Sequence, residues 1–244
     1  MKYMGSKNRI ANQILPIILK DRNENQCYIE PFVGGANIID KVDGNRIGGD
    51  KNKYLIEMWK GLQLKKERPH TITKGMYSKA RVDYRNNKNE SYSDFLIGWI
   101  GWMGSFNGRF FDGGYSGHST GKTKRDYIAE QIRNTEKQID SVKGVEFIHS
   151  SYETLYVPPN SIIYCDPPYK NTKQYDVSKN FDYEKFWNWV KEMSLKGHKV
   201  YVSEYIAPSD FQCLWQKQIT NSMNQTKTTK PVEKLFTYKN KGMK

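Results

Sequence analysis

Hydrophobic and polar positions follow two different periods along this chain of 244 residues. Short runs of strand-forming residues that end at a turn or a polar residue predict strands at 27–29, 45–50, 145–148, 161–165 and 199–203. Apolar residues that recur every three or four positions predict helices from Asn8 onward and at 36–41, 51–64, 123–142, 181–195 and 208–216. Strands and helices that alternate in this way predict an α/β fold with one largely parallel sheet.

Residues 65–142 depart from this repeat. They are charged and weakly patterned at first, with short helices expected around 77–85, and then include an apolar, glycine-containing helix at 95–103. We therefore expect a larger domain formed by residues 1–64 and 143–244, with residues 65–142 inserted as a smaller lobe of helices and loops. Near the C-terminus, residues 226–239 are expected to form a closing hairpin that tolerates Pro231 at a sheet edge.

Composition narrows the classes of partner. Net charge is +13, from 39 Lys and Arg against 26 Asp and Glu, which favours encounters with a polyanion such as nucleic acid. A basic, solvated surface would produce the same excess. Three widely separated cysteines and four scattered histidines lack the spacing of a disulfide framework or a zinc site, so we expect no bound metal. No apolar run is long enough to span a bilayer and no secretory signal opens the chain, so we expect a cytoplasmic protein without membrane contact.

The stretch 161–169 carries the strongest chemical signal. Its strand runs directly into Asp166, Pro167, Pro168 and Tyr169. Proline cannot continue a sheet ladder, so the chain turns just past the carboxyl end of the strand, where open α/β sheets bind their ligands. An ordinary turn would also use Asp and Pro. We interpret the stretch as a functional site, and we expect residues 170–181 to form a flap over it.

Two earlier strands end in the pattern of a nucleoside-binding site. The first leads to Glu30, Phe32 and the glycine pair Gly34–Gly35, where the missing Cβ atoms let the backbone approach a ligand, although a double glycine is more often only a turn. The second ends at Asp50. An acid at this position accepts hydrogen bonds from ribose hydroxyls, or it caps the following helix.

The N-terminal residues form a glycine loop. Gly5 stands beside Tyr3 and Lys7, and Ser6 is expected to cap the helix that begins at Asn8. A glycine beside an aromatic ring, a lysine and a helix N-terminus is suited to holding a carboxylate. An ordinary helix-entry turn has the same residues.

Residues 104–117 form a long loop in which five glycines and four aromatic residues surround Arg109. Such a length is uncommon in a compact domain unless the loop is functional or disordered. Aromatic rings interleaved with arginine and amide groups suit stacking on bases and hydrogen bonds to base edges. The residues that we expect to contact DNA are Ser105, Asn107, Arg109, Lys122, Lys124 and Arg125. The alternative is a surface loop whose aromatic rings only pack it down.

Taken in order, the segments 3–7, 30–35, 49–50 and 166–169 resemble the motifs of the Dam-type (D12 class) DNA adenine-N6 methyltransferases. They span nearly the whole chain, with the recognition region between the cofactor half and the catalytic half. Two departures are Glu30, where Asp is more usual, and Ala36, where Gly often follows the glycine pair. The resemblance implies a Rossmann-like fold that depends on S-adenosylmethionine.

The resemblance also implies which residues bind this cofactor: Tyr3, Gly5, Lys7, Glu30, Phe32, Gly34, Gly35, Asp50 and Asp166. By position, Tyr3 and Lys7 would hold the methionine end, and Asp50 would bind the ribose hydroxyls. Phe32 and the glycine pair would line the adenosyl group. Asp166 would border both the cofactor and the target base.

The catalytic group implied by the resemblance is Asp166, Pro167, Pro168 and Tyr169. Adenine N6 is a poor nucleophile because its lone pair is delocalised into the ring. The Asp166 carboxylate and the Pro167 carbonyl would accept both N6 hydrogens and localise that lone pair. Tyr169 would stack on a base that has been flipped out of the duplex.

We therefore expect a site-specific DNA methyltransferase that acts on the N6 amine of a flipped-out adenine in double-stranded DNA. GATC is the first expectation for its target, and we expect a monomer or weak dimer in a prokaryotic or phage-infected cell. Two alternatives stay open. One is an N-methyltransferase that acts on RNA or on a protein amide, although enzymes of the latter kind favour Asn at the position of Asp166. The other is a catalytically silent DNA-binding relative.

Overall fold

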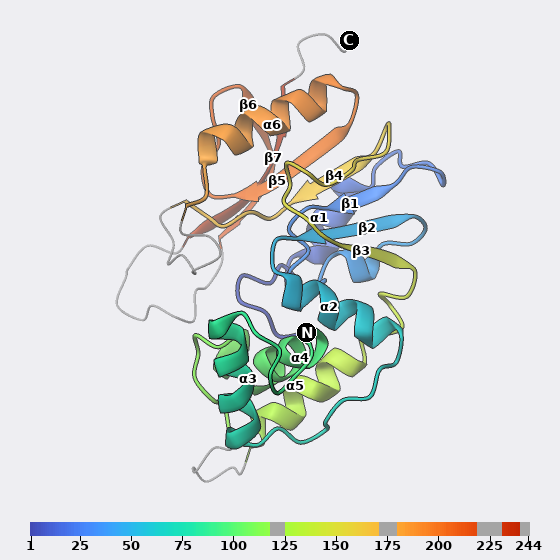
Figure 1. Ribbon diagram of the computed structural model, residues 1–244. Helices are drawn as coiled ribbons and strands as arrows, with labels where there is room; N and C mark the ends of the chain where they lie inside the picture. The colour runs from blue at the N-terminus through green and yellow to red at the C-terminus, as the bar shows by residue number, and fades with distance from the viewer. Residues whose placement is uncertain (118–124, 171–179, 219–230, 240–244) are drawn as a thin grey trace. The chain divides into compact units, whose positions relative to one another are not determined.

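The computed structural model describes residues 1–117, 125–170, 180–218 and 231–239 (Figure 1). Its strands are β1 Tyr28–Glu30, β2 Arg46–Asp50, β3 Val145–His149, β4 Ile162–Cys165, β5 Lys199–Glu204, β6 Phe211–Gln218 and β7 Val232–Tyr238. They follow the order β3-β2-β1-β4-β5-β7-β6 in one sheet. The pairs β1–β2, β1–β4 and β4–β5 are parallel, whereas β7 runs antiparallel to β5 and β6. The predicted α/β class and the five predicted strands are confirmed.

Apart from the first, each α-helix in the described residues begins at a residue whose side chain caps it. The helices found in the described residues are α1 Ala11–Ile18, α2 Lys53–Gln63, α3 Lys74–Asn86, α4 Asp94–Gly104, α5 Tyr127–Glu136 and α6 Tyr183–Leu195, with short 3-10 turns η1 Ile39–Lys41 and η2 Phe106–Gly108. Side-chain oxygens accept first-turn backbone N–H groups at the starts of α2 to α6, from Asn52, Thr73, Ser93, Asp126 and Asp182. These residue types are the preferred N-caps. No helix in the described ranges is both long and apolar enough to cross a membrane.

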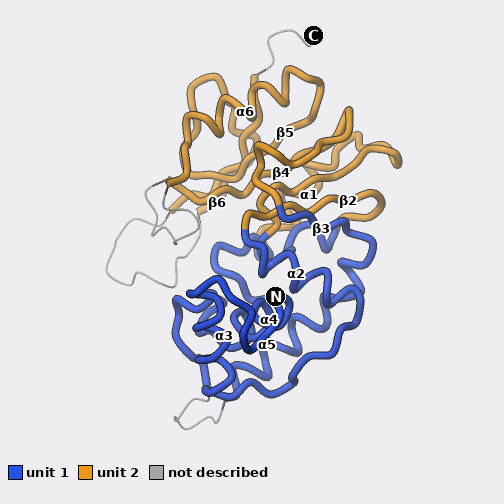
Figure 2. The backbone as a smooth tube through the Cα atoms, viewed as in Figure 1, with its two compact units in different colours: residues 1–9, 34–41, 52–149 blue, residues 10–33, 42–51, 150–244 orange. Residues whose placement is uncertain are grey.

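The chain divides into two compact units (Figure 2). Unit 1 contains residues 1–9, 34–41 and 52–149, and unit 2 contains residues 10–33, 42–51 and 150–244. Helices α2 to α5 therefore belong to unit 1, together with β3. The other strands, with α1 and α6, belong to unit 2. The unit boundaries differ from those expected, because residues 1–9, 34–41, 52–64 and 143–149 group with the helical part. Which part is catalytic and which recognises the target stays a prediction.

In unit 2, the central strands are buried along their whole length. Each residue of β1 and of β4 is buried, as expected for parallel strands that are covered on both faces. Helix α6 packs against β5 and β7. These continuous apolar runs made the strands recognisable in the sequence.

Unit 1 is organised around α4. Nine of its eleven residues are buried, and both α2 and α3 pack against it. Trp59 of α2 and Trp99 of α4 are fully buried. The expected apolar helix at 95–103 is confirmed, and the expected short helices around 77–85 form a single helix of 13 residues, α3.

Two predictions about helices are wrong, and a third helix is shorter than predicted. Ser6 does not cap the first helix, since α1 starts at Ala11 and the Ser6 hydroxyl accepts the nearby Asn8 N–H group at 3.3 Å. At 36–41 only the turn η1 forms, because Ala36 takes a left-handed conformation with φ of 52° that breaks a helix. The predicted helix at 123–142 is shorter, with α5 covering ten residues.

The C-terminal elements also differ from the prediction. Most of the helix expected at 208–216 is replaced by strand β6, because pairing with β7 overrides the local helical pattern. Of the hairpin expected at 226–239, residues 226–230 lie outside the described residues, and in the described part β7 pairs with both β5 and β6. Pro231 precedes β7, which is an internal strand, so its expected place at a sheet edge is wrong.

Candidate active site

The first predicted site residues follow the paired ends of β1 and β2 in unit 2. The two strands are parallel, with Glu30 opposite Gly48. When this register is continued by two residues, Phe32 becomes level with Asp50. The aromatic ring and the carboxylate predicted for the adenosyl group therefore leave adjacent strand ends of the same unit.

Strand β4 adds Asp166 to the same row. It is parallel to β1 on the side opposite β2, with Ile29 opposite Ile163. Three residues farther along, Asp166 is level with Phe32. Phe32, Asp50 and Asp166, which we call the strand-end row, thus stand at the carboxyl edge of three neighbouring strands. All three are partly exposed.

Local hydrogen bonds fix Asp50 in this row. The Val33 N–H group donates to the Gly49 carbonyl at 2.9 Å, and the Ser150 N–H group donates to the Asp50 carbonyl at 3.1 Å. Asp50 is not the cap of α2, because Asn52 accepts the first-turn N–H groups. The alternative that gave Asp50 a capping role is therefore wrong.

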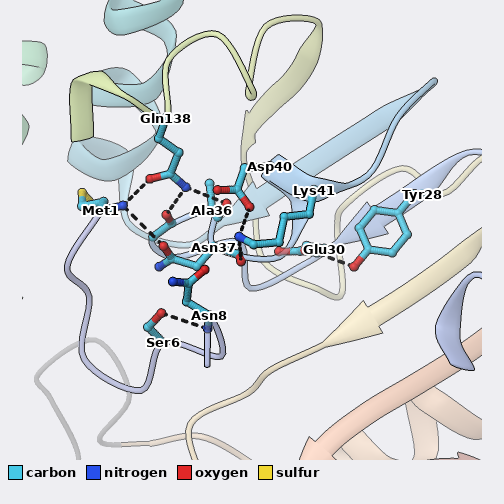
Figure 3. A network of polar contacts seen from close by, with 11 residues as sticks. Met1, Ser6, Asn8, Tyr28, Glu30, Ala36, Asn37, Asp40, Lys41 and Gln138 are labelled. Atoms are coloured by element: carbon cyan, nitrogen blue, oxygen red, sulfur yellow. Dashed lines mark hydrogen bonds and ion pairs between the residues drawn. The ribbon is translucent and has the colours of Figure 1, made fainter. Parts of the chain in front are cut away.

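Glu30 has a different environment from its neighbours in the row. It is 3% exposed, and its Oε1 atom accepts the Tyr28 hydroxyl at 2.9 Å (Figure 3). Burial, followed by the nearby Glu30 carboxylate, raises the pKa of Tyr28 well above its ordinary value. The contact of Glu30 with a cofactor stays a prediction.

An aromatic cluster extends the strand-end row within unit 2. The Phe32 ring lies 5.6 Å from Tyr152, 5.9 Å from Phe181 and 5.7 Å from Phe186, centroid to centroid. Sequence reasoning missed Tyr152 and Phe181 as site residues. A signal existed for Tyr152, which follows β3 in a loop, but its contact with Phe32 depends on long-range packing.

The segment after Asp166 is anchored through its tyrosine. Pro167 and Tyr169 are buried, and the Tyr169 hydroxyl donates a hydrogen bond to Glu233. Burial, Asp166 and Glu233, in this order, raise the pKa of Tyr169 well above its ordinary value. The expected flap at 170–181 falls mostly on residues 171–179, which lie outside the described residues.

In unit 1, the glycine pair makes room for Tyr3. A Cβ atom on Gly34 would lie 2.8 Å from the Tyr3 ring, and one on Gly35 would lie 2.6 Å from the Tyr3 Cβ atom. The other side of Tyr3 faces Trp102, with the rings nearly parallel and 6.3 Å apart. Both glycines are therefore required by packing within the protein, whether or not a ligand approaches them.

The carbonyl groups of this glycine turn are held by side chains. The Trp59 indole donates to the Gly34 carbonyl at 3.1 Å, and the Gln138 amide donates to the Gly35 carbonyl at 3.1 Å. The same amide donates to the Ala36 carbonyl at 2.8 Å (Figure 3). These bonds maintain the left-handed conformation of Ala36, in which glycine would be unstrained. The structure thus explains why a third glycine suits this position.

Lys7 is buried in the N-terminal loop. It is 8% exposed, and its amino group donates to the Gly5 carbonyl at 3.0 Å. Gly5 has a φ of 80°, and a Cβ atom there would meet no other atom within 4 Å. The loop therefore needs glycine for its backbone conformation and not for space.

The loop predicted to contact DNA, residues 104–117, packs against side chains of α3 and α4. The Ser105 hydroxyl is buried, where it accepts the Phe111 N–H group at 2.9 Å and pairs with the Tyr77 hydroxyl at 3.1 Å. The Phe110 ring stacks on Trp102 with centroids 3.9 Å apart. Most of the aromatic rings thus pack the loop down, as the alternative interpretation held, whereas Phe106 is 52% exposed.

The other residues predicted to contact DNA differ in their burial and in their hydrogen-bond partners. Asn107 and Arg109 are half-buried, and Asn107 has a left-handed φ of 58°. Arg125 forms two hydrogen bonds with Glu130, at 2.6 and 2.8 Å. Lys122 and Lys124 lie outside the described residues. DNA contact by these residues stays a prediction.

Comparison with known proteins identifies the family. Residues 3–235 match the model of the D12 class N6 adenine-specific DNA methyltransferases. The chain belongs to this family.

Individual members of the D12 class are distant in sequence. The chain is 25% identical over 214 residues to the type II methyltransferase M.FokI of Planomicrobium okeanokoites, and 25% identical over 224 residues to the modification methylase StsI of Streptococcus sanguinis. These alignments cover 80% and 84% of this chain but only 32% and 33% of the two relatives, so the chain spans about a third of their length. It is 24% identical to the type II methyltransferase M.MjaIII of Methanocaldococcus jannaschii, with 83% and 82% of the two chains covered.

Within unit 2 of this D12-class chain, the donor set fits the nucleoside part of S-adenosylmethionine, because Asp50 offers a partly exposed carboxylate for ribose hydroxyls and Phe32 offers a partly exposed ring for adenine. In unit 1, Lys7 has a buried amine of the charge that suits a carboxylate, and its contact with the cofactor stays a prediction. Asp50 and Phe32 are level on adjacent strands, which suits two parts of one nucleoside. Within the described residues, no group of three or more His, Cys, Asp or Glu side chains is arranged to hold a metal ion.

Proposed function

We propose that this D12-class chain transfers a methyl group from S-adenosylmethionine to the N6 amine of an adenine in duplex DNA. The observation that carries the proposal is the strand-end row, in which Asp166 stands one strand away from Phe32 and two strands away from Asp50. A base amine held by Asp166 would thereby lie close to a nucleoside held by the other two. The family match supports the same reaction.

The protein's own contribution is to activate the amine. The bound cofactor supplies an electrophilic methyl group on a sulfonium centre. Asp166 and the Pro167 carbonyl accept the two N6 hydrogens and draw the nitrogen toward tetrahedral geometry, which localises its lone pair. The Asp166 carboxylate then stabilises the positive charge that develops on N6. The methylated amine loses one hydrogen as a proton to solvent, which reaches the partly exposed Asp166. No side-chain nucleophile is required.

Access to the amine requires the adenine to leave the duplex. Unstacking costs a few kcal/mol, and stacking on an aromatic ring restores about 1–3 kcal/mol per base. We assign that ring to Tyr169, whose hydroxyl is already tied to Glu233. We assign cofactor binding to Tyr3, Gly5, Lys7, Glu30, Phe32, Gly34, Gly35, Asp50 and Asp166. GATC is the first target to test.

The proposal is tested by incubating the protein with labelled S-adenosylmethionine and either duplex DNA or RNA. We expect label on N6-methyladenine in DNA and at least tenfold less in RNA. Preferential label in RNA would favour an RNA methyltransferase. Cofactor binding by calorimetry without transfer to either polymer would favour a catalytically silent DNA-binding relative.

Helix α3 of unit 1 supports DNA as the partner. Lys74, Arg81 and Arg85 recur along one side of the helix at a spacing of seven and four residues, and none has an ion pair among the described residues. Lys74 lies in the first turn, where a cation opposes the helix dipole, and Arg81 and Arg85 repel each other at i, i+4, whereas Arg85 by itself suits the last turn. The position of Lys74 and the arginine pair therefore reduce helix stability, which favours a functional role. We infer that the three side chains contact DNA phosphates.

Changing these three residues to Gln should lower the dependence of DNA affinity on salt. Each lost phosphate contact should reduce the slope of log K against log salt concentration by about 0.9, so the slope should fall by up to about 3. Affinity should drop equally for all DNA sequences. Fluorescence anisotropy at several salt concentrations measures both.

The matched control changes Lys185, Lys191 and Lys196 of unit 2 to Gln, which removes the same charge. Two of these lysines already pair with Glu153 and Asp210. Equal changes of slope in the two triple variants would show that net charge alone matters and that α3 is not a phosphate-binding surface.

A further inference from the structure

Two buried carboxylates in unit 2 have no role in the site described so far. Glu204 ends β5 and Glu233 lies at the start of β7, and they are only 2% and 3% exposed. The two strands are antiparallel with Glu204 opposite Lys234, so both carboxylates come from the same end of the pair. A carboxylate taken out of water destabilises the fold unless hydrogen bonds and partners compensate. Their partners therefore indicate what they do.

Glu233 binds the last residue of the catalytic segment. The hydroxyl of Tyr169 donates to Glu233, and the Tyr169 ring packs edge-on against Tyr205 with centroids 4.7 Å apart. Tyr169 is itself only 8% exposed. The carboxylate thus fixes both the position and the rotation of the ring.

Glu204 binds Lys170, the residue that follows Tyr169. Its Oε2 atom accepts the Lys170 N–H group at 3.1 Å, and its Oε1 atom accepts the Tyr205 N–H group at 2.7 Å. The carboxylate therefore links the segment after β4 to the segment after β5. Both oxygens are used in doing so.

We propose that Glu233 and Glu204 are positioning residues that hold the segment carrying Asp166 in place for methyl transfer. The inference rests on the proposed function. Pro167 and Pro168 have no N–H group, so they donate nothing that could tether the turn. The Tyr169 hydroxyl and the Lys170 amide donate instead, and the two glutamates receive them. A small misplacement of Asp166 would matter, because methyl transfer requires reacting atoms to be aligned.

The carboxylates of Glu204, Glu233 and Asp166 repel one another when they are charged. Burial, and then the nearby Asp166 and Glu233 carboxylates, raise the pKa of Glu204 to about 7, although the bonds from Tyr205 and Lys170 act in the opposite direction. Three carboxylates so arranged reduce stability near neutral pH. Groups that reduce stability beside a reactive residue are typical of functional sites.

The kinetic test uses the full chain, labelled S-adenosylmethionine and duplex DNA. We expect Tyr169→Phe and Glu233→Ala each to lower kcat about ten- to a hundredfold, with little change in cofactor Kd. Because they break the same bond, the double variant should be no slower than the worse single variant. Glu233→Gln keeps an acceptor and should recover most of the rate.

Tyr164→Phe is the matched control. It removes another buried tyrosine hydroxyl from the same unit, one that pairs with Ser203 at 2.8 Å. It should lower Tm to a similar degree while kcat stays within about twofold. Tyr169→Phe removes one oxygen and keeps the ring, so it tests the inference even if Glu233→Ala does not fold. Additive losses, or a wild-type kcat in Tyr169→Phe, would overturn the role of Glu233. A wild-type protein that methylates no DNA would instead refute the proposed function.

A pH series tests Glu204 separately. Its folded-state pKa is above the ordinary value, so the folded protein keeps a proton that the unfolded chain releases. The wild-type free energy of unfolding should therefore fall as pH rises from about 5 to 8, relative to Glu204→Gln, which does not titrate. The kcat of Glu204→Gln should also be reduced about tenfold or more. Parallel stability profiles together with an unchanged kcat would remove Glu204 from the proposal.

Discussion

Asp166→Asn is expected to lower the rate of methyl transfer to duplex DNA by about a hundred- to a thousandfold, the size of effect seen when one group that stabilises developing charge is removed. Asn has the same shape, but its amide presents N–H groups where the carboxylate accepts hydrogens from the adenine amine. It also lacks the negative charge that stabilises N6 as it becomes positive. The loss should therefore appear in the rate constant of methyl transfer measured in single-turnover reactions with labelled cofactor.

Cofactor binding and folding separate this effect from general damage. Calorimetry should give a cofactor Kd within about tenfold of wild type, and Tm should not fall, because Asn removes one of three neighbouring carboxylates. Asp210→Asn is the control, since Asp210 pairs with Lys191 in the same unit and has no place in the site. It should leave kcat within about twofold. Near-wild-type transfer by Asp166→Asn would exclude the proposed role of this carboxylate.

The strand ends of the site were predictable because their signal is local. The run 161–165 is apolar and stops at an acid and two prolines, so both the buried strand β4 and its sharp end follow from the residue types. The same holds for β2 and Asp50. In a parallel sheet, strand ends meet at one edge, and the registers of β1 with β2 and β4 place three predicted residues in one row.

What could not be predicted depends on contacts between distant residues. In the sequence, Glu204 only follows a predicted strand and Glu233 lies in a predicted hairpin. The β5–β7 pairing brings them near Tyr169, which is 64 residues from Glu233. Likewise, β6 has a helical pattern of apolar residues but becomes a strand because β7 offers a pairing edge. Gly34 and Gly35 were assigned to ligand approach, yet the structure shows that Tyr3 occupies the space beside them.

Gly98→Ala should produce the largest loss of stability among glycine-to-alanine substitutions within the helices of unit 1. A Cβ atom at this position of α4 would lie 2.2 Å from the backbone carbonyl oxygen of Tyr54 and 3.0 Å from the Met58 Cβ atom, both in α2. A backbone carbonyl cannot move aside, so the two helices would have to separate. Overpacking of this kind destabilises by about 1–3 kcal/mol, and more where the obstacle is rigid. Thermal unfolding of the purified variant measures the change.

Alanine substitutions at two other glycines test the same steric effect with softer or more distant obstacles. In Gly61→Ala the new methyl group would meet the Phe95 ring at 2.2 Å, an obstacle that is a side chain and is able to shift in part, so the loss should be smaller. In Gly75→Ala, at the exposed start of α3, the nearest atom is 3.8 Å away, and alanine should stabilise the helix by about 0.5–1 kcal/mol. A loss of stability that increases in the order Gly75→Ala, Gly61→Ala, Gly98→Ala would therefore separate steric cost from helix propensity. Equal changes of Tm at Gly75 and Gly98 would mean that α2 and α4 do not approach as closely as the structure places them.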